Sequence, residues 1–153
     1  MMTPYTAYQT EDLDGFLNKQ LDAINVASVE GNQQLKGRFK RAMNRAQAIL
    51  GRNAFRKMSY SDKNLTPVNR ALFEVWTVLL DSLDDGQVAQ LQSKRSDLEL
   101  GWNNLMKDEE FVRAISQSTG NVKSVQSRFE KIENLVQNVL NDRDQTYDLE
   151  VLS

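Results

Sequence analysis

The sequence contains neither histidine nor cysteine among its 153 residues. Without histidine, the commonest general base at neutral pH and the usual nitrogen ligand for transition metals are missing. Without cysteine, thiol nucleophiles, zinc–thiolate sites and disulfides are excluded. Carboxylates, lysine, tyrosine, serine and threonine remain for chemistry, and carboxylate-bound magnesium is the one common site that they comfortably permit. We therefore expect a non-catalytic protein with no metal and no cofactor.

Proline and glycine are scarce as well, with two and seven residues respectively, and this scarcity favours long helices over many short strands. No run of residues approaches the roughly 20 apolar positions that a membrane span requires. The N-terminal segment has no basic region followed by an apolar run, so no signal peptide is expected. With 40% hydrophobic and 26% charged residues, we expect one globular domain that is cytoplasmic and has no contact with a membrane.

Apolar residues recur at spacings of three and four along most of the chain, which predicts an all-α, single-domain bundle of five to six helices. Thr66 followed by Pro67 fits an N-cap and a proline at the first helical position. The helix that starts there, at about 67–83, is apolar over more than half of its circumference and is expected to be the buried centre of the domain. Other helices are expected over 13–24, 33–50, 88–105, 109–115 and 122–140.

Capping residues support several of these helix ends. Thr10 or Asp12 can cap the first helix, and Gly51 lies where a C-terminal cap glycine belongs. Residues 52–65 are expected to form a loop with one turn. On this basis the chain divides into three parts: a flexible arm at 1–9, a helical domain at 10–141 and a loose tail at 142–153.

Charge is distributed unevenly. Residues 31–61 contain eight basic and no acidic residues, whereas residues 74–110 contain nine acidic and three basic ones. The basic segment at 36–57 is a candidate binding site for nucleic-acid phosphate or for an acidic face of a protein partner. The alternative is that it lies beside the acidic helices of the same fold, so that the two neutralise each other. The candidate residues are Lys36, Arg38, Lys40, Arg41, Arg45, Arg52, Arg56 and Lys57.

Two patterns that resemble chemical sites are better explained by structure. Residues 31–38 have two glycines and an arginine, as a phosphate loop does, but the spacing is wrong, the Lys-Ser/Thr end is missing and no strand precedes them. The acids at 84–85 and 108–110 could hold magnesium, yet each group lies at an expected helix start. There acids cap the helix and complement its dipole, and Asp108 is the expected cap of the short helix. No catalytic or metal-binding residue is therefore predicted.

Three segments in a fixed order resemble one bacterial family. They are GRNAFRK at 51–57, PVNRALFEVWTVLLDSLDD at 67–85 and DEEFVRAISQSTGNVKSVQSRFEKIENLV at 108–136. Their order and spacing are similar to the helical, C-terminal part of the domain-of-unknown-function family 262, over roughly residues 13–140. The positions that match the family pattern are Asn53, Phe55, Arg56, Lys57, Asn69, Phe73, Trp76, Thr119, Arg128, Phe129 and Glu133.

The resemblance implies a context of restriction and phage defence, because larger members of that family include GmrSD-type modification-dependent restriction enzymes. Those members add a ParB-like nucleotide-hydrolysing domain with a DGQQR motif, and some carry an HNH nuclease. Here Asp85-Gly86-Gln87 lacks the arginine, and an HNH site requires histidine. The resemblance therefore implies a non-catalytic helical partner, or a truncated component, that docks with a ParB-like or nuclease subunit. A nucleic-acid-binding module that uses the basic segment is the alternative.

Overall fold

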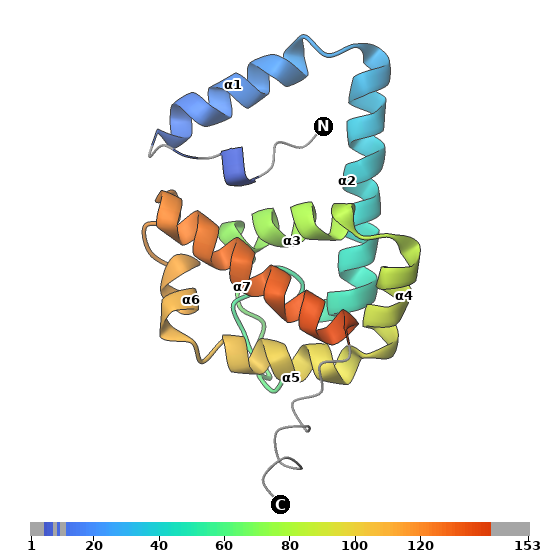
Figure 1. The fold of residues 1–153 in the computed structure, drawn as a ribbon, viewed down its shortest axis with the longest axis vertical. Coiled ribbons are helices and arrows are strands. Elements are labelled where there is room, and N and C mark those ends of the chain that lie inside the picture. Colours follow the sequence, from blue (N-terminus) through green and yellow to red (C-terminus); the bar gives the residue numbers. More distant parts are fainter. Residues whose placement is uncertain (1–4, 8, 10–11, 142–153) are drawn as a thin grey trace, which may run out of the picture.

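The structure of the protein is a computed structural model that describes residues 5–7, 9 and 12–141 (Figure 1). These residues form seven α-helices and two short 3-10 helices, with one isolated antiparallel bridge and no strand. The predicted all-α, single-domain fold is confirmed, with one helix more than expected. The elements are η1 (Tyr5–Ala7), α1 (Leu13–Asn25), α2 (Val29–Leu50), η2 (Gly51–Asn53), α3 (Arg70–Ser82), α4 (Asp85–Ser93), α5 (Arg95–Leu105), α6 (Glu109–Ala114) and α7 (Val122–Leu140).

α3 is the centre of the bundle, as the sequence predicts, and it packs against both α2 and α7 (Figure 1). Leu72, Val75 and Leu80 have no exposed surface, and Trp76 is 2% exposed. The Trp76 ring lies 6.0 Å from the ring of Trp102 on α5, measured between centroids. Removing this apolar face from water stabilises the fold by about 25 cal/mol for each Å² buried.

α3 begins at Arg70 and not at the proline three residues earlier. Its N-cap is Asn69, whose Oδ1 accepts a hydrogen bond from the Leu72 backbone N–H at 3.0 Å. Thr66 instead donates its hydroxyl to the Lys57 carbonyl at 3.4 Å. The Thr66 side chain therefore bonds within the loop and does not cap α3, so the predicted cap at Thr66 is wrong.

The single helix predicted at 88–105 is two helices, α4 and α5, broken at Lys94. The Lys94 backbone leaves the helical conformation, with φ −101° and ψ 31°. Its ammonium donates to the Val139 carbonyl at 3.2 Å, and the Gln90 side-chain amide donates to the Leu140 carbonyl at 2.6 Å. The end of α4 is therefore tied to the end of α7, and the prediction of a continuous helix is wrong.

α2 starts at Val29, four residues earlier than predicted, because the Ser28 hydroxyl accepts a first-turn backbone N–H at 3.1 Å. Its buried residues begin only at Ala42, and the part before that extends beyond the bundle while contacting α3 through Arg38, Phe39 and Arg41 (Figure 1). α1 runs back from the top of α2 and is capped by Asp12, as predicted. We call residues 13–41, which comprise α1, the connecting turn and this upper part of α2, the α1–α2 arm.

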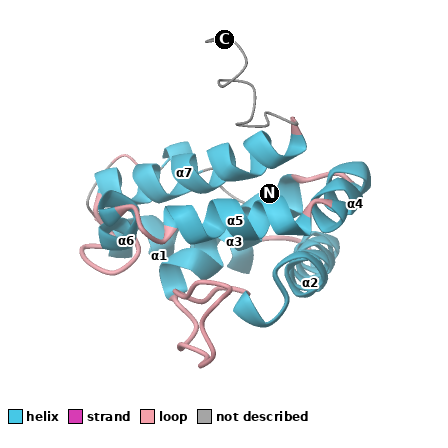
Figure 2. Cartoon of the chain, turned by 90° about the horizontal axis from the view of Figure 1, so that it is seen from below, coloured by secondary structure: helices cyan, strands magenta, loops and turns pink. Residues whose placement is uncertain are grey.

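Within the segment at 1–9, residues 5–7 form η1, which lies against α7. The alternative cap Thr10 and the predicted tail at 142–153 lie outside the described residues. None of the helices described is long and apolar enough to cross a membrane. Seen from below, the loop between η2 and α3 projects from the bundle beside α2 (Figure 2).

Candidate functional site

The candidate basic segment lies on α2, on η2 and in the loop that follows. In the described part of the chain, six of its eight cations donate hydrogen bonds to oxygen atoms of the protein itself. Three of the six contact carboxylates of the acidic stretch at 74–110, so part of the charge asymmetry is neutralised inside the fold. The six are Arg38, Arg41, Arg45, Arg52, Arg56 and Lys57.

Asp81 on α3 is the centre of an ion cluster with two of these arginines. Arg38 donates to its Oδ2 through Nε at 2.9 Å and also through Nη2, and Arg41 donates to its Oδ1 at 3.1 Å. The Asp81 side chain is only 3% exposed, and burial by itself raises its pKa. The hydrogen bonds and charges of both arginines outweigh burial and hold the pKa below the ordinary value. The ionised carboxylate therefore joins α2 to α3.

Arg45 is the one cation of the segment that is buried, with 10% of its side chain exposed. Its Nη1 donates to the carbonyls of Leu80 at 2.7 Å and Leu83 at 2.8 Å, and its Nη2 donates to Asp85 at 2.9 Å. These carbonyls lie at the C-terminal end of α3, where the helix lacks internal donors and its dipole is negative. Arg45 therefore caps α3 from the side.

The other three bonded cations hold the loop after α2. Arg52 and Arg56 donate to backbone carbonyls of the loop itself. Lys57 donates to the Ser116 hydroxyl, just beyond α6, at 2.7 Å. A groove lies between α2 and α4, and none of these three residues lines it.

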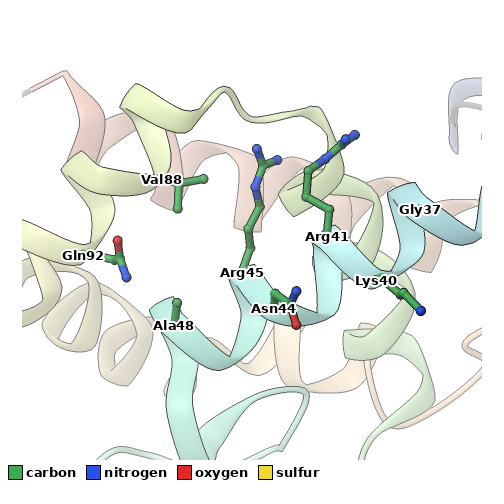
Figure 3. A pocket seen from close by; sticks show the side chains of 8 residues that line it. All are labelled: Gly37, Lys40, Arg41, Asn44, Arg45, Ala48, Val88 and Gln92. Atoms are coloured by element: carbon green, nitrogen blue, oxygen red, sulfur yellow. The ribbon is translucent and has the colours of Figure 1, made fainter. Parts of the chain in front are cut away.

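This groove has a volume of about 470 Å³. Arg41 and Arg45 extend into it on the same side of α2, whereas Lys40 points the other way (Figure 3). Both arginines are engaged with carboxylates, so Lys40 is the one cation lining the groove that has no such partner among the described residues. Lys36 and Lys40 are exposed, and neither has a hydrogen bond or ion pair within residues 12–141. The structure therefore does not gather the eight predicted residues into one cationic site.

The acidic clusters at helix starts have the structural role predicted for them. Asp84 and Gln87 form a reciprocal capping box at the start of α4, with hydrogen bonds of 2.8 and 3.0 Å. Asp108 accepts the Phe111 backbone N–H at 3.1 Å, and the Lys131 ammonium at 2.6 Å lowers the Asp108 pKa. Among the described residues, no group of three acidic side chains could hold a metal ion.

Several positions that carry the family resemblance form internal contacts. Phe55 and Phe73 pack edge to face with centroids 4.9 Å apart. The Arg128 side chain is 3% exposed and donates to Glu74 and to the Thr119 carbonyl, each at 2.6 Å. Packing and ion pairing account for these residues without a ligand.

Tyr60, in the loop before α3, gives the fold a measurable alkaline sensitivity. Burial and the charge of Glu99 raise its pKa to about 12, although Arg95 acts in the opposite direction. The folded state therefore favours the neutral phenol, and this contribution to stability is complete below about pH 10. We expect the free energy of unfolding to fall by about 2–3 kcal/mol as the pH rises from 10 to 12.

Denaturant unfolding at about pH 9 and about pH 11.5 measures this loss of stability. The Tyr60→Phe variant is the control, because phenylalanine does not titrate and lysine deprotonation affects both proteins equally. The same alkaline loss in both proteins would show that Tyr60 is not its source.

The exposed apolar residues of the α1–α2 arm are the feature that sequence reasoning missed. Leu21, Ile24 and Phe39 have the helical spacing of a core-facing stripe, but the structure leaves them 55%, 41% and 45% exposed. Val26 and Val29, at the tip of the arm, are 85% and 75% exposed. Five of the eight large exposed hydrophobic side chains of the described residues therefore lie on the arm. In the sequence, these exposed residues are signalled by Val26 and Val29, which lie on either side of the Ser28 cap and belong to neither of the apolar stripes predicted for the first two helices.

The described residues thus carry most of their large exposed hydrophobic side chains on the arm, and their basic segment is mostly engaged within the fold. Comparison with family models, with curated proteins and with solved structures finds no match to this chain.

Proposed function

We propose that this protein is a non-catalytic, α-helical interaction domain that docks onto another protein through the α1–α2 arm. The observation that carries the proposal is the apolar surface of the arm, where five large hydrophobic side chains are at least 41% exposed. Apolar surface of this kind is usually covered by a partner, because covering it releases water from the hydrophobic side chains.

A partner would also add stability to the arm. α1 contributes Phe16 to the edge of the core, but Leu21 and Ile24 further along the helix are exposed. A helix of 13 residues is marginal in water unless its apolar face is packed. A protein surface laid over these side chains would supply that packing, at up to about 1.5–3 kcal/mol for each side chain that becomes fully buried.

The resemblance of the three segments suggests the setting in which the domain works. It favours a component of a restriction or phage-defence system, with a ParB-like nucleotide-hydrolysing subunit or a nuclease as the protein that this domain serves. Such systems act on DNA inside the bacterial cell, so a cytoplasmic location belongs to the same proposal.

Co-purification from the native host tests this function. The arm variant carries Leu21→Asp and Ile24→Asp, and the matched control is Leu100→Asp, because Leu100 on α5 is 63% exposed but lies outside the arm. We expect the wild type and the control to retain a ParB-like or nuclease subunit and the arm variant to lose it by about 100-fold or more. Circular dichroism verifies that all three proteins fold. If the arm variant retains the subunit as well as the wild type does, the arm is not the docking surface. If none of the three proteins retains such a subunit, the proposed defence setting is wrong.

Nucleic-acid binding is the alternative function, and it is favoured by Lys36 and Lys40, which are exposed and have no ion pair with any described residue. Titration with duplex and single-stranded oligonucleotides at about 50 and 200 mM salt separates the two functions, because phosphate contacts make binding steeply salt-dependent. Replacing both lysines with glutamate should flatten that dependence. If the wild type binds neither oligonucleotide at the lower salt concentration, this alternative is excluded.

A further inference from the structure

We propose that the arm's partner is a second copy of this chain, with α1 of each copy packed against the basic upper part of α2 of the other. This inference rests on the proposed interaction role of the arm: the second copy covers the arm itself, and the ParB-like or nuclease subunit binds the dimer that results, so a variant that breaks the dimer also loses that subunit. It is carried by the apolar side chains of the arm and by the signs of the charges beside them.

The apolar stripe of α2 continues beyond the body of the protein. In the lower part of the helix, Ala42, Ala46 and Ile49 are buried at 0–1% exposure against the core. One and two turns earlier, Phe39 and Leu35 continue the same row at spacings of three and four residues. Phe39 is 45% exposed even though its ring lies 6.2 Å from Phe73 of α3. The upper stripe is therefore only half covered by this chain.

The two helices of the arm carry opposite charge. Residues 12–25 contain three carboxylates and one lysine, a net charge of −2. Residues 29–45 contain five cations and one acid, Glu30, a net charge of +4. The carboxylates of α3 and α4 that contact these cations, Asp81 and Asp85, reduce the net charge to +2. An acidic α1 and a basic α2 are thus complementary in sign and similar in magnitude.

Within one copy these opposite charges do not meet. α1 and α2 diverge from the turn at the tip of the arm (Figure 1). Asp14, Asp22 and Glu30 have no ion pair within the described residues, and neither have Lys36 and Lys40. These five charges are therefore available to another molecule, whereas Arg38 and Arg41 are engaged with Asp81.

A second copy satisfies both requirements at once. A two-fold axis brings the same patch of both copies together, so α1 of the first meets α2 of the second and the reverse contact forms automatically. The apolar residues of the arm then lie at the centre of the interface, and the acidic and basic rows form charge pairs around it. A partner of one charge sign would match only one of the two helices.

Sedimentation velocity of the purified chain over about 1–200 µM tests the inference, because dimers form by mass action. We expect a species with twice the mass of one chain. The arm variant with Leu21→Asp and Ile24→Asp should raise the dissociation constant by about 100-fold or more, whereas the Leu100→Asp control should not change it. High salt should weaken the wild-type dimer, because it screens the charge pairs.

A charge exchange makes the test specific to the proposed arrangement. One variant reverses the basic row with Lys36→Glu and Lys40→Glu, and a second reverses the acidic row with Asp14→Lys and Asp22→Lys. Each variant alone should dimerise about 10-fold or more weakly, because like charges face each other. An equimolar mixture should recover the dimer, since both contacts in a mixed pair again join opposite charges. Failure of the mixture to recover would overturn the pairing of α1 with α2.

The outcomes separate this inference from the function on which it rests. A chain that stays monomeric at about 200 µM has no second copy on its arm, and the inference is then wrong. If the arm variant nevertheless loses a heterologous subunit in the co-purification, the docking function stands with another partner. If the chain is monomeric and that subunit is also retained by the arm variant, both proposals are wrong.

Discussion

Replacing Arg45 with methionine is expected to lower the free energy of unfolding by about 2–4 kcal/mol, although Arg45 belongs to a segment with the composition of a binding site. The substitution keeps much of the side-chain volume but removes the donors to the Leu80 and Leu83 carbonyls at 2.7 and 2.8 Å. Both carbonyls then lack a partner at the end of α3, and each buried orphan costs about 1–3 kcal/mol. The loss of Asp85 as a partner adds little, because the Asp85 side chain is 99% exposed and stays hydrated.

Equilibrium unfolding in urea measures this change, with Lys40→Met as the matched control on the same helix. Lys40 is exposed and unpaired in the described structure, so its replacement should change stability by less than about 0.5 kcal/mol. Similar stabilities for the two variants would mean that Arg45 is not a structural cap and that its charge is available to a ligand.

The second large effect is expected at Trp102, where substitution by alanine should lower the free energy of unfolding by about 3–5 kcal/mol. The ring is 5% exposed and lies 6.0 Å from both Trp76 and Phe111, measured between centroids. Its Nε1 donates to the Met58 carbonyl at 2.8 Å, which fixes the loop after η2 onto α5. Alanine leaves a large cavity and also orphans that carbonyl.

Trp102→Phe separates the two contributions, because phenylalanine fills most of the cavity but cannot donate the hydrogen bond. Its loss should be smaller than that of alanine, at about 1–3 kcal/mol. The chain has two tryptophans, so the fluorescence of Trp76 reports unfolding of both variants. A phenylalanine variant as unstable as the alanine variant would assign the whole effect to the hydrogen bond.

Periodicity was sufficient to predict the helices and the central position of α3, because the spacing of Leu72, Val75 and Trp76 determines which side of a helix avoids water. It could not place the ends that depend on distant partners. α3 starts only after its cap Asn69 because the chain before it is held by the loop, and α4 ends before Lys94 because that residue reaches the end of α7. Such contacts join residues nine to forty-five positions apart, and local composition contains no information about them.

The candidate site shows the same limit. The run of cations could be read from the sequence, and so could the possibility that acidic helices neutralise it. The sequence could not show which cation pairs with which acid, because partners such as Arg38 and Asp81 lie 43 positions apart. The apolar stripe of α1 was also visible, but a stripe shows only that a helix has an apolar side. Whether that side meets this chain or another molecule depends on where the tertiary fold leaves Leu21 and Ile24.

Asn69 couples three parts of the protein through one side chain and one backbone amide. Its Oδ1 caps α3, its Nδ2 donates to the Ile115 carbonyl after α6 at 2.8 Å, and its backbone N–H donates to the Phe55 carbonyl at 2.7 Å. If the loop, the first turn of α3 or the end of α6 opens, Asn69 loses a hydrogen bond that helps to hold it in place for the other two segments. The loop, the first turn of α3 and the end of α6 should therefore exchange their amide hydrogens as one cooperative unit, so that the projecting loop is more strongly protected than its place on the surface suggests.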